Sequence, residues 1–224
     1  ITKGDIRASF ERIEGAGKTI TKLWNVCRFI DSFKHVEKRP KKLEATDRWI
    51  LREINALVTY ARKQYEMYDF HTPAVRLRHF LWEVFASHYI ELVKNRAYNT
   101  NGDFTDDEQQ SALFALNECI DTFLKLLAPA VPIVTYKLFK DMRNKDIHKE
   151  PFPDVVEADV VPFTTDDIVA TNSFIWKEKK DRGMSLKAPV DEATVPATLK
   201  PIEKDLLLAH TIRKIQYGDL ALKW

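Results

Sequence analysis

The sequence has little glycine or cysteine and no long apolar run. Its 224 residues include 6 glycines and 2 cysteines, against 13 phenylalanines and 5 tryptophans. Scarce glycine and abundant aromatic side chains argue against a disordered or loop-rich chain. No run of about 18 apolar residues occurs, which excludes a transmembrane helix, and no apolar signal-peptide core follows Ile1. We therefore expect a cytoplasmic globular chain without a membrane partner, and we interpret Ile1 as a boundary within a longer polypeptide.

The two cysteines, Cys27 and Cys119, each lie within an apolar pattern of helical period. Such positions favour buried thiols in a reducing compartment. A zinc site needs more ligands, placed closer together. The sequence therefore predicts no metal site.

Five successive segments carry apolar residues at helical spacing. They cover about residues 17–33, 46–65, 73–98, 106–127 and 132–144, with Thr46 as a plausible N-cap of the second. The third segment is apolar around most of its circumference, which is typical of the central helix of a bundle. These segments predict a helical bundle.

The pattern changes after residue 146. Prolines and valines through residue 163 indicate an extended crossing segment, followed by a helix over about 166–182 that ends at Gly183. A strand over 190–199, a helix over 202–214 and a strand near Trp224 are expected beyond it. We predict a mainly α fold with a small C-terminal α/β appendage: a connector over 1–16, the bundle over 17–146, and the extended segment with the appendage over 147–224.

The segment 17–33 has an unusual polar face. At 100° per residue, one side carries the expected core stripe, Ile20, Leu23, Trp24, Cys27 and Ile30. The opposite side carries Lys18, Lys22, Asn25 and Phe29. An exposed ring can stack on an unpaired base, worth ~1–3 kcal/mol, while lysines neutralise phosphates and an asparagine amide contacts base edges. Phe29 could equally pack on a neighbouring helix, and the wheel alone leaves both interpretations open.

Basic residues cluster although the formal net charge is only +2. One group follows the segment 17–33 directly: Lys34, Lys38, Arg39, Lys41 and Lys42. A solvated surface is the plain interpretation of such a run, but its position also favours contact with an RNA backbone. Lys94 and Arg96 end the third segment, where they could meet phosphates or favour the negative helix terminus.

Several motifs resemble those of archaeal-type valyl-tRNA synthetases, which are class I aminoacyl-tRNA synthetases. Residues 22–25 (KLWN) with Arg28-Phe29 resemble the first helix of their anticodon-binding bundle, and Asp5-Ile6-Arg7 resembles the segment before it. Further matches occur in the same order at residues 47–51, 89–98, 126–132, 147–153 and 183–189.

The resemblance implies an all-helical anticodon-binding domain whose partners are tRNA(Val) and the catalytic domain of the same polypeptide, in a monomer. It places anticodon contacts at Lys22 and Phe29. The family's preceding arginine falls on Glu11, so Arg12 beside it is the expected contact. The HIGH and KMSKS signatures are absent from this sequence, so we expect tRNA binding without catalysis or cofactor, with ATP and Mg²⁺ acting in the parent's catalytic domain. An isoleucine enzyme's domain and a non-catalytic helical scaffold remain the alternatives.

Overall fold

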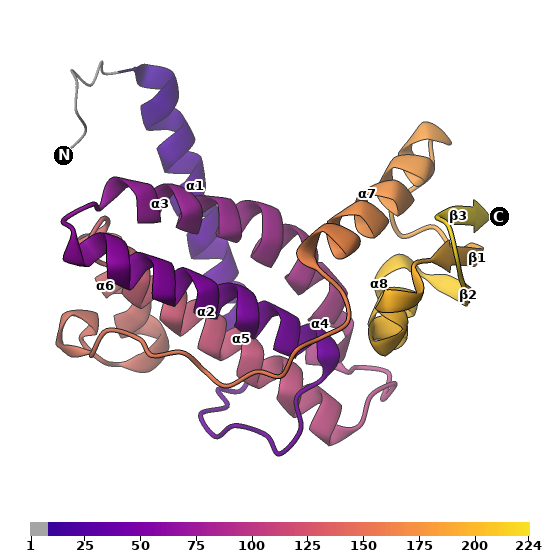
Figure 1. Cartoon of the computed structure of the whole chain (residues 1–224), viewed down its shortest axis with the longest axis horizontal. Coiled ribbons are helices and arrows are strands. Elements are labelled where there is room, and N and C mark those ends of the chain that lie inside the picture. The colour runs from indigo at the N-terminus through magenta and orange to yellow at the C-terminus, as the bar shows by residue number, and fades with distance from the viewer. Residues whose placement is uncertain (1–8) are drawn as a thin grey trace.

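The structure, a computed structural model, describes residues 9–224, and the Asp5-Ile6-Arg7 motif lies outside the described residues. Its larger part is a bundle of helical rods (Figure 1). They are α1 (Phe10–Asp31), α2 (Ala45–Glu66), a continuous rod of α3 (His71–His79), η1 (Phe80–Tyr89) and α4 (Ile90–Tyr98), then α5 (Asp106–Leu127) and α6 (Pro132–Arg143). The predicted bundle is confirmed. Its first helix begins seven residues before the expected residue 17, within the predicted connector.

Local sequence explains where two of the helices begin. Thr105 caps α5 through a capping box: its side chain accepts from the Glu108 backbone N–H, and the Glu108 carboxylate accepts from the Thr105 backbone N–H. Pro132 starts α6, where its missing N–H costs nothing. The prediction that Thr46 caps α2 is wrong, because that helix begins at Ala45 and the buried Thr46 hydroxyl donates instead to Asp205 Oδ2, 2.5 Å away.

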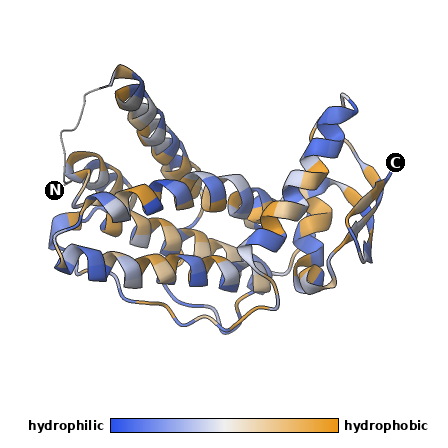
Figure 2. Ribbon diagram, turned by 45° about the horizontal axis from the view of Figure 1, so that its top comes forward, coloured by the Kyte–Doolittle hydropathy of each residue, from blue (hydrophilic) through white to orange (hydrophobic). Residues whose placement is uncertain are grey.

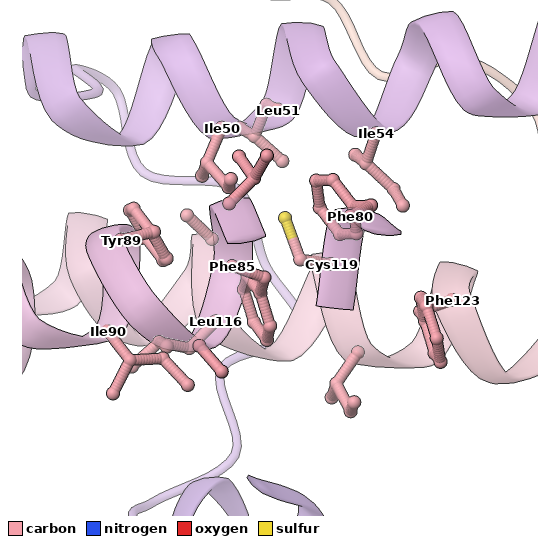
Figure 3. Packing of buried hydrophobic residues seen from close by; sticks show 14 of the residues in the cluster. Ile50, Leu51, Ile54, Phe80, Phe85, Tyr89, Ile90, Leu116, Cys119 and Phe123 are labelled. Atoms are coloured by element: carbon pink, nitrogen blue, oxygen red, sulfur yellow. The ribbon is translucent and has the colours of Figure 1, made fainter. Parts of the chain in front are cut away.

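The central rod passes through the core, as its apolar circumference predicts. Its middle part, η1, is a π-helix, and the rings of Phe80, Phe85 and Tyr89 stack along it with centroids 5.7 Å and 5.6 Å apart. Figure 3 shows these rings packed between Ile50, Leu51 and Ile54 of α2 on one side and residues of α5 on the other. Figure 2 shows apolar residues gathered along the central helices and polar ones on the outer faces.

An extended segment crosses the bundle and leads to the appendage (Figure 1). After a short 3₁₀ turn, η2 (Ile147–Lys149), it lies along α2. The Asn55 amide pairs with both backbone groups of Val156, at 2.6 Å and 2.9 Å, and Arg62 donates to the Pro153 carbonyl at 3.1 Å. These side chains replace the backbone ladder that an isolated extended segment lacks.

The appendage comprises α7 (Thr165–Asp181), β1 (Val190–Val195), η3 (Ala197–Ile202), α8 (Glu203–His210), β2 (Ile212–Tyr217) and β3 (Ala221–Lys223). The strand order is β2-β1-β3, with β1 parallel to β2 and antiparallel to β3. The helix predicted over 202–214 is too long, since Thr211 takes a left-handed conformation (φ 55°) and ends α8. The residues that follow, Ile212–Tyr217, form β2 beside β1.

A buried polar chain joins the appendage to the bundle. His210 of α8 donates through Nε2 to Asn172 Oδ1 at 2.7 Å, and Asn172 of α7 donates through Nδ2 to His88 Nδ1 of η1 at 3.0 Å. The Trp176 ring packs against both imidazoles. Lys179 of α7 is buried and donates to the carbonyls of Leu186 and His210. No helix within residues 9–224 combines the length and apolarity needed to cross a membrane.

Candidate nucleic-acid interface

The interior face of α1 differs from the predicted stripe. Leu23, Cys27 and Ile30 are buried as expected, and Val26 is buried with them. Ile20 and Trp24, predicted to be core, are 37% and 36% exposed. The buried arc is therefore turned by about 50° from the prediction, at 100° per residue. The turn brings the opposite edge of α1, which carries Lys22 and Phe29, closer to its neighbours.

The predicted polar residues of α1 lie in different surroundings. The Lys22 ammonium lies 5.2 Å from the centroid of the Trp82 ring of η1, whose indole N–H donates to the Thr19 hydroxyl at 3.2 Å. Lys18 pairs with Glu14 at 2.8 Å on a solvated face, and Asn25 is exposed. The side chain of Arg12 lies outside the described residues. Lys22 is thus held by a cation–π contact at the edge of the packed surface.

Phe29 is half-buried and has aromatic partners. Its ring meets Phe33 edge-on with centroids 5.1 Å apart, and Tyr98 of α4 at 6.0 Å, while Phe33 and Tyr98 lie 4.8 Å apart. Of the two interpretations that the sequence left open, packing on a neighbouring helix applies to the edge of Phe29 that meets Tyr98, and base contact by this half-buried ring stays a prediction. We call Phe29, Phe33 and Tyr98 the aromatic cluster. Its most exposed member is Tyr98, at 55%.

Sequence analysis did not select Tyr98 as a site residue. The available signal was its position, since a tyrosine ends a helix that is otherwise largely buried and stands directly before the polar turn Asn99-Thr100-Asn101-Gly102. An aromatic residue there does not belong to the core stripe. It becomes informative only beside Phe29 and Phe33, which come from the other end of the bundle sequence.

The basic segment lies next to the aromatic cluster, in the connection between α1 and α2. Its five cations are all exposed: Lys34, Lys38, Arg39, Lys41 and Lys42. Arg39 donates to the Glu157 carbonyl of the crossing segment, and Lys42 pairs with Glu44 at 3.0 Å. Within residues 9–224, no hydrogen bond or ion pair engages Lys34, Lys38 or Lys41. These three amines are placed to meet phosphates, and that role stays a prediction.

The prediction that Arg96 contacts an RNA backbone is wrong. Its side chain is 1% exposed and binds two buried carboxylates, Asp47 Oδ2 at 2.6 Å and Asp205 Oδ1 at 3.0 Å. Burial alone would lower the pKa of the guanidinium, but Asp205 and Asp47 outweigh it and raise that pKa above its ordinary value. Lys94, two residues earlier in the same helix, is partly exposed and pairs with Glu91. Arg96 therefore holds α2, α4 and α8 together.

A known family matches the chain from α2 onward. Residues 47–195 match the family described as the anticodon-binding domain of tRNA ligase. The match covers more than half of the chain and runs from α2 through β1. This chain belongs to that family of anticodon-binding domains.

Its relatives include archaeal valine–tRNA ligases. The protein of Pyrobaculum aerophilum is 35% identical over 219 residues, which are 96% of this chain and 27% of that protein. Those of Aeropyrum pernix and Nanoarchaeum equitans are each 32% identical, over 92% and 93% of this chain and 26% of each protein. The chain thus spans about a quarter of the length of these relatives. The alignments extend beyond the family match and include most of α1.

Proposed function

We propose that this chain is the tRNA-binding part of a valine–tRNA ligase and that it holds the anticodon stem-loop of tRNA(Val). The observation that supports this most directly is the aromatic cluster, partly open to solvent, beside the exposed lysines of the basic segment. Anticodon-loop bases can unstack, and single-stranded RNA is recognised by stacking on aromatic rings together with contacts to base edges. The relatives, which are valine–tRNA ligases, favour valine over isoleucine.

In this proposal each part of the surface has a separate task. The open edges of Phe29 and Tyr98 receive unstacked bases, and the Asn25 amide contacts a base edge. Lys18, Lys22 and the basic segment neutralise phosphates, which contributes salt-dependent affinity without sequence preference. The packed bundle keeps these groups in fixed positions, so little ordering accompanies binding. Valine activation with ATP and Mg²⁺ then belongs to parts of the polypeptide outside this chain, which acts as a monomer.

The proposal is tested by measuring binding of this chain to tRNA(Val) and tRNA(Ile) transcripts at two salt concentrations. Phe29→Ala should weaken binding to tRNA(Val) by about tenfold or more, as expected from losing one stacked base. Lys22→Ala should lower the salt dependence by about one phosphate contact. Tyr68→Ala is the matched control, because Tyr68 is 79% exposed in the turn between α2 and α3, before the start of the helical rod that ends at Tyr98, and it should bind as wild type.

Three results would contradict parts of the proposal. Equal or tighter binding to tRNA(Ile) would remove the assignment to valine. Binding that is insensitive to salt would favour a protein-interaction scaffold, since phosphate contacts require a steep dependence. A large fall in Tm for Phe29→Ala, with wild-type affinity once folded, would make Phe29 a packing residue alone.

A further inference from the structure

A polar cavity lies at the turn between α4 and α5. Its volume is about 380 Å³, which is large enough for a nucleobase. Six residues line it: Asn95 and Tyr98 from the last turn of α4, Thr100, Asn101 and Asp103 from the turn, and Leu208 from α8. Tyr98 belongs both to this lining and to the aromatic cluster, so the cavity is continuous with the proposed RNA surface.

The turn that forms one wall is held in place. Asn99 takes a left-handed conformation (φ 47°), and its side-chain amide binds both backbone groups of Phe104, donating to the carbonyl at 2.8 Å and accepting from the N–H at 3.0 Å. Phe104 is buried, with the Lys204 ammonium 4.4 Å from its ring centroid. Lys204 is itself fixed by Glu108 at 2.9 Å. The wall is thus formed before any ligand arrives.

The polar groups of the lining are unused by the fold. Within the part of the chain that the structure describes, the side chains of Asn95, Thr100, Asn101 and Asp103 make no hydrogen bond, and neither does the Tyr98 hydroxyl. Asparagine amides offer both donors and acceptors, and the carboxylate of Asp103 only accepts. The lining contains no lysine or arginine, so it suits the base of a nucleotide and not its phosphate.

We propose that this cavity binds one unpaired nucleobase that carries an exocyclic amino group: cytosine, adenine or guanine. The base stacks on Tyr98, its amino group donates to the Asp103 carboxylate, and the amides of Asn95 and Asn101 contact its remaining edge. A carboxylate that only accepts discriminates against uracil, which presents a carbonyl oxygen at the corresponding position. The inference rests on the proposed function and adds a base-selective site to it.

The test uses this chain with fluorescently labelled heptanucleotides of cytidine, adenosine or uridine, and with a tRNA(Val) transcript. Wild type should bind the cytidine and adenosine oligomers about tenfold more tightly than the uridine oligomer, as expected for one charge-assisted hydrogen bond. Asp103→Ala should abolish this ratio. Tyr98→Ala should weaken binding to all three at least fivefold, about the lower limit for one stacked base. Tyr98→Phe, which keeps the ring, and Tyr68→Ala, the distant exposed tyrosine, should retain wild-type affinity.

The outcomes separate the two proposals. A wild-type ratio between the oligomers in Asp103→Ala, together with salt-dependent binding of tRNA(Val), would overturn the cavity site and leave the proposed function intact. Wild-type affinity of Tyr98→Ala would remove base stacking on Tyr98 from both proposals. Absence of RNA binding by the folded wild-type chain would overturn both. Equal affinity of wild type for all three oligomers would also overturn the base selectivity. Tm measurements on each variant show whether a loss reflects the site or unfolding.

Discussion

Replacing Arg96 with alanine tests the assignment of this residue to the interior. The guanidinium makes four hydrogen bonds to carboxylate oxygens, two to Asp47 at 2.6 Å and 3.0 Å and two to Asp205 at 3.0 Å and 3.1 Å. It also donates to the Glu108 carbonyl at 3.0 Å. Arg96→Ala leaves two adjacent buried carboxylates without a countercharge. Removing one partner of a buried ion pair costs about 3–5 kcal/mol.

That loss corresponds to a fall in Tm of roughly 6–20 °C, since a chain of this size loses about 2–4 °C per kcal/mol. Urea denaturation followed by circular dichroism measures the free energy of unfolding directly. The matched control is Arg213→Ala, which removes an exposed pair with Asp191 (2.8 Å) and should cost less than about 1 kcal/mol.

The same variant makes a second, pH-dependent prediction. Burial raises the pKa of Asp205 even with Arg96 present, and loss of the guanidinium should raise that pKa further. A carboxyl whose folded pKa exceeds its unfolded pKa binds more protons in the native state, so its stability contribution increases as pH falls. The deficit in unfolding free energy of Arg96→Ala relative to wild type should therefore become smaller as pH falls from 7 to 5. A cost below about 1 kcal/mol at pH 7, or a deficit that grows on acidification, would refute the reasoning.

Three further predictions concern other buried groups. Burial lowers the pKa of His210 to about 3. The stability that the neutral imidazole contributes is therefore complete above the unfolded pKa of 6.5 and is lost as pH falls towards 3, with a slope of up to about 1.4 kcal/mol per pH unit. His210→Gln should flatten the profile of urea-unfolding free energy against pH, and an unchanged slope would contradict a neutral buried imidazole. Burial raises the pKa of the Cys27 and Cys119 thiols, so neither should react with a thiol-specific chromogenic reagent until denaturant is added, and rapid labelling of the native chain would disprove their burial. Asn99→Ala should lower the free energy of unfolding by about 1–3 kcal/mol in chemical denaturation, because it strains a left-handed residue and removes both contacts to Phe104. Asn99→Gly relieves the strain and should lower it less, and equal losses would assign the effect to the side chain alone.

The parts of the fold that sequence predicted well depend on local signals. The bounds of α5 follow from Thr105 and Glu108 at its start, and those of α6 from Pro132 at its start and the left-handed Asn144 at its end. A cap involves residues three or four positions apart, so the sequence contains the complete interaction. The mainly helical fold and the small α/β appendage were predictable for this reason.

The errors have a different physical origin. Arg96 binds Asp47 and Asp205, which lie 49 and 109 positions away along the chain, and no periodicity reveals such partners. In α1 the buried arc is set by contacts with η1, α5 and α6, and one wheel shows only that an apolar side exists. The strand β2 was missed because it pairs with β1, 22 positions earlier for Ile212 and Val190.

The last turn of α4 connects stability to the proposed recognition of RNA. Arg96 points inward to the two carboxylates, while Asn95 and Tyr98 on the same turn line the cavity at the surface. Because four hydrogen bonds to Asp47 and Asp205 fix the position of Arg96, the backbone that carries Tyr98 is fixed as well. The proposed base-binding surface on the aromatic cluster is therefore held in place, and the buried ion pair, which costs desolvation energy, supplies the rigidity that the proposal requires.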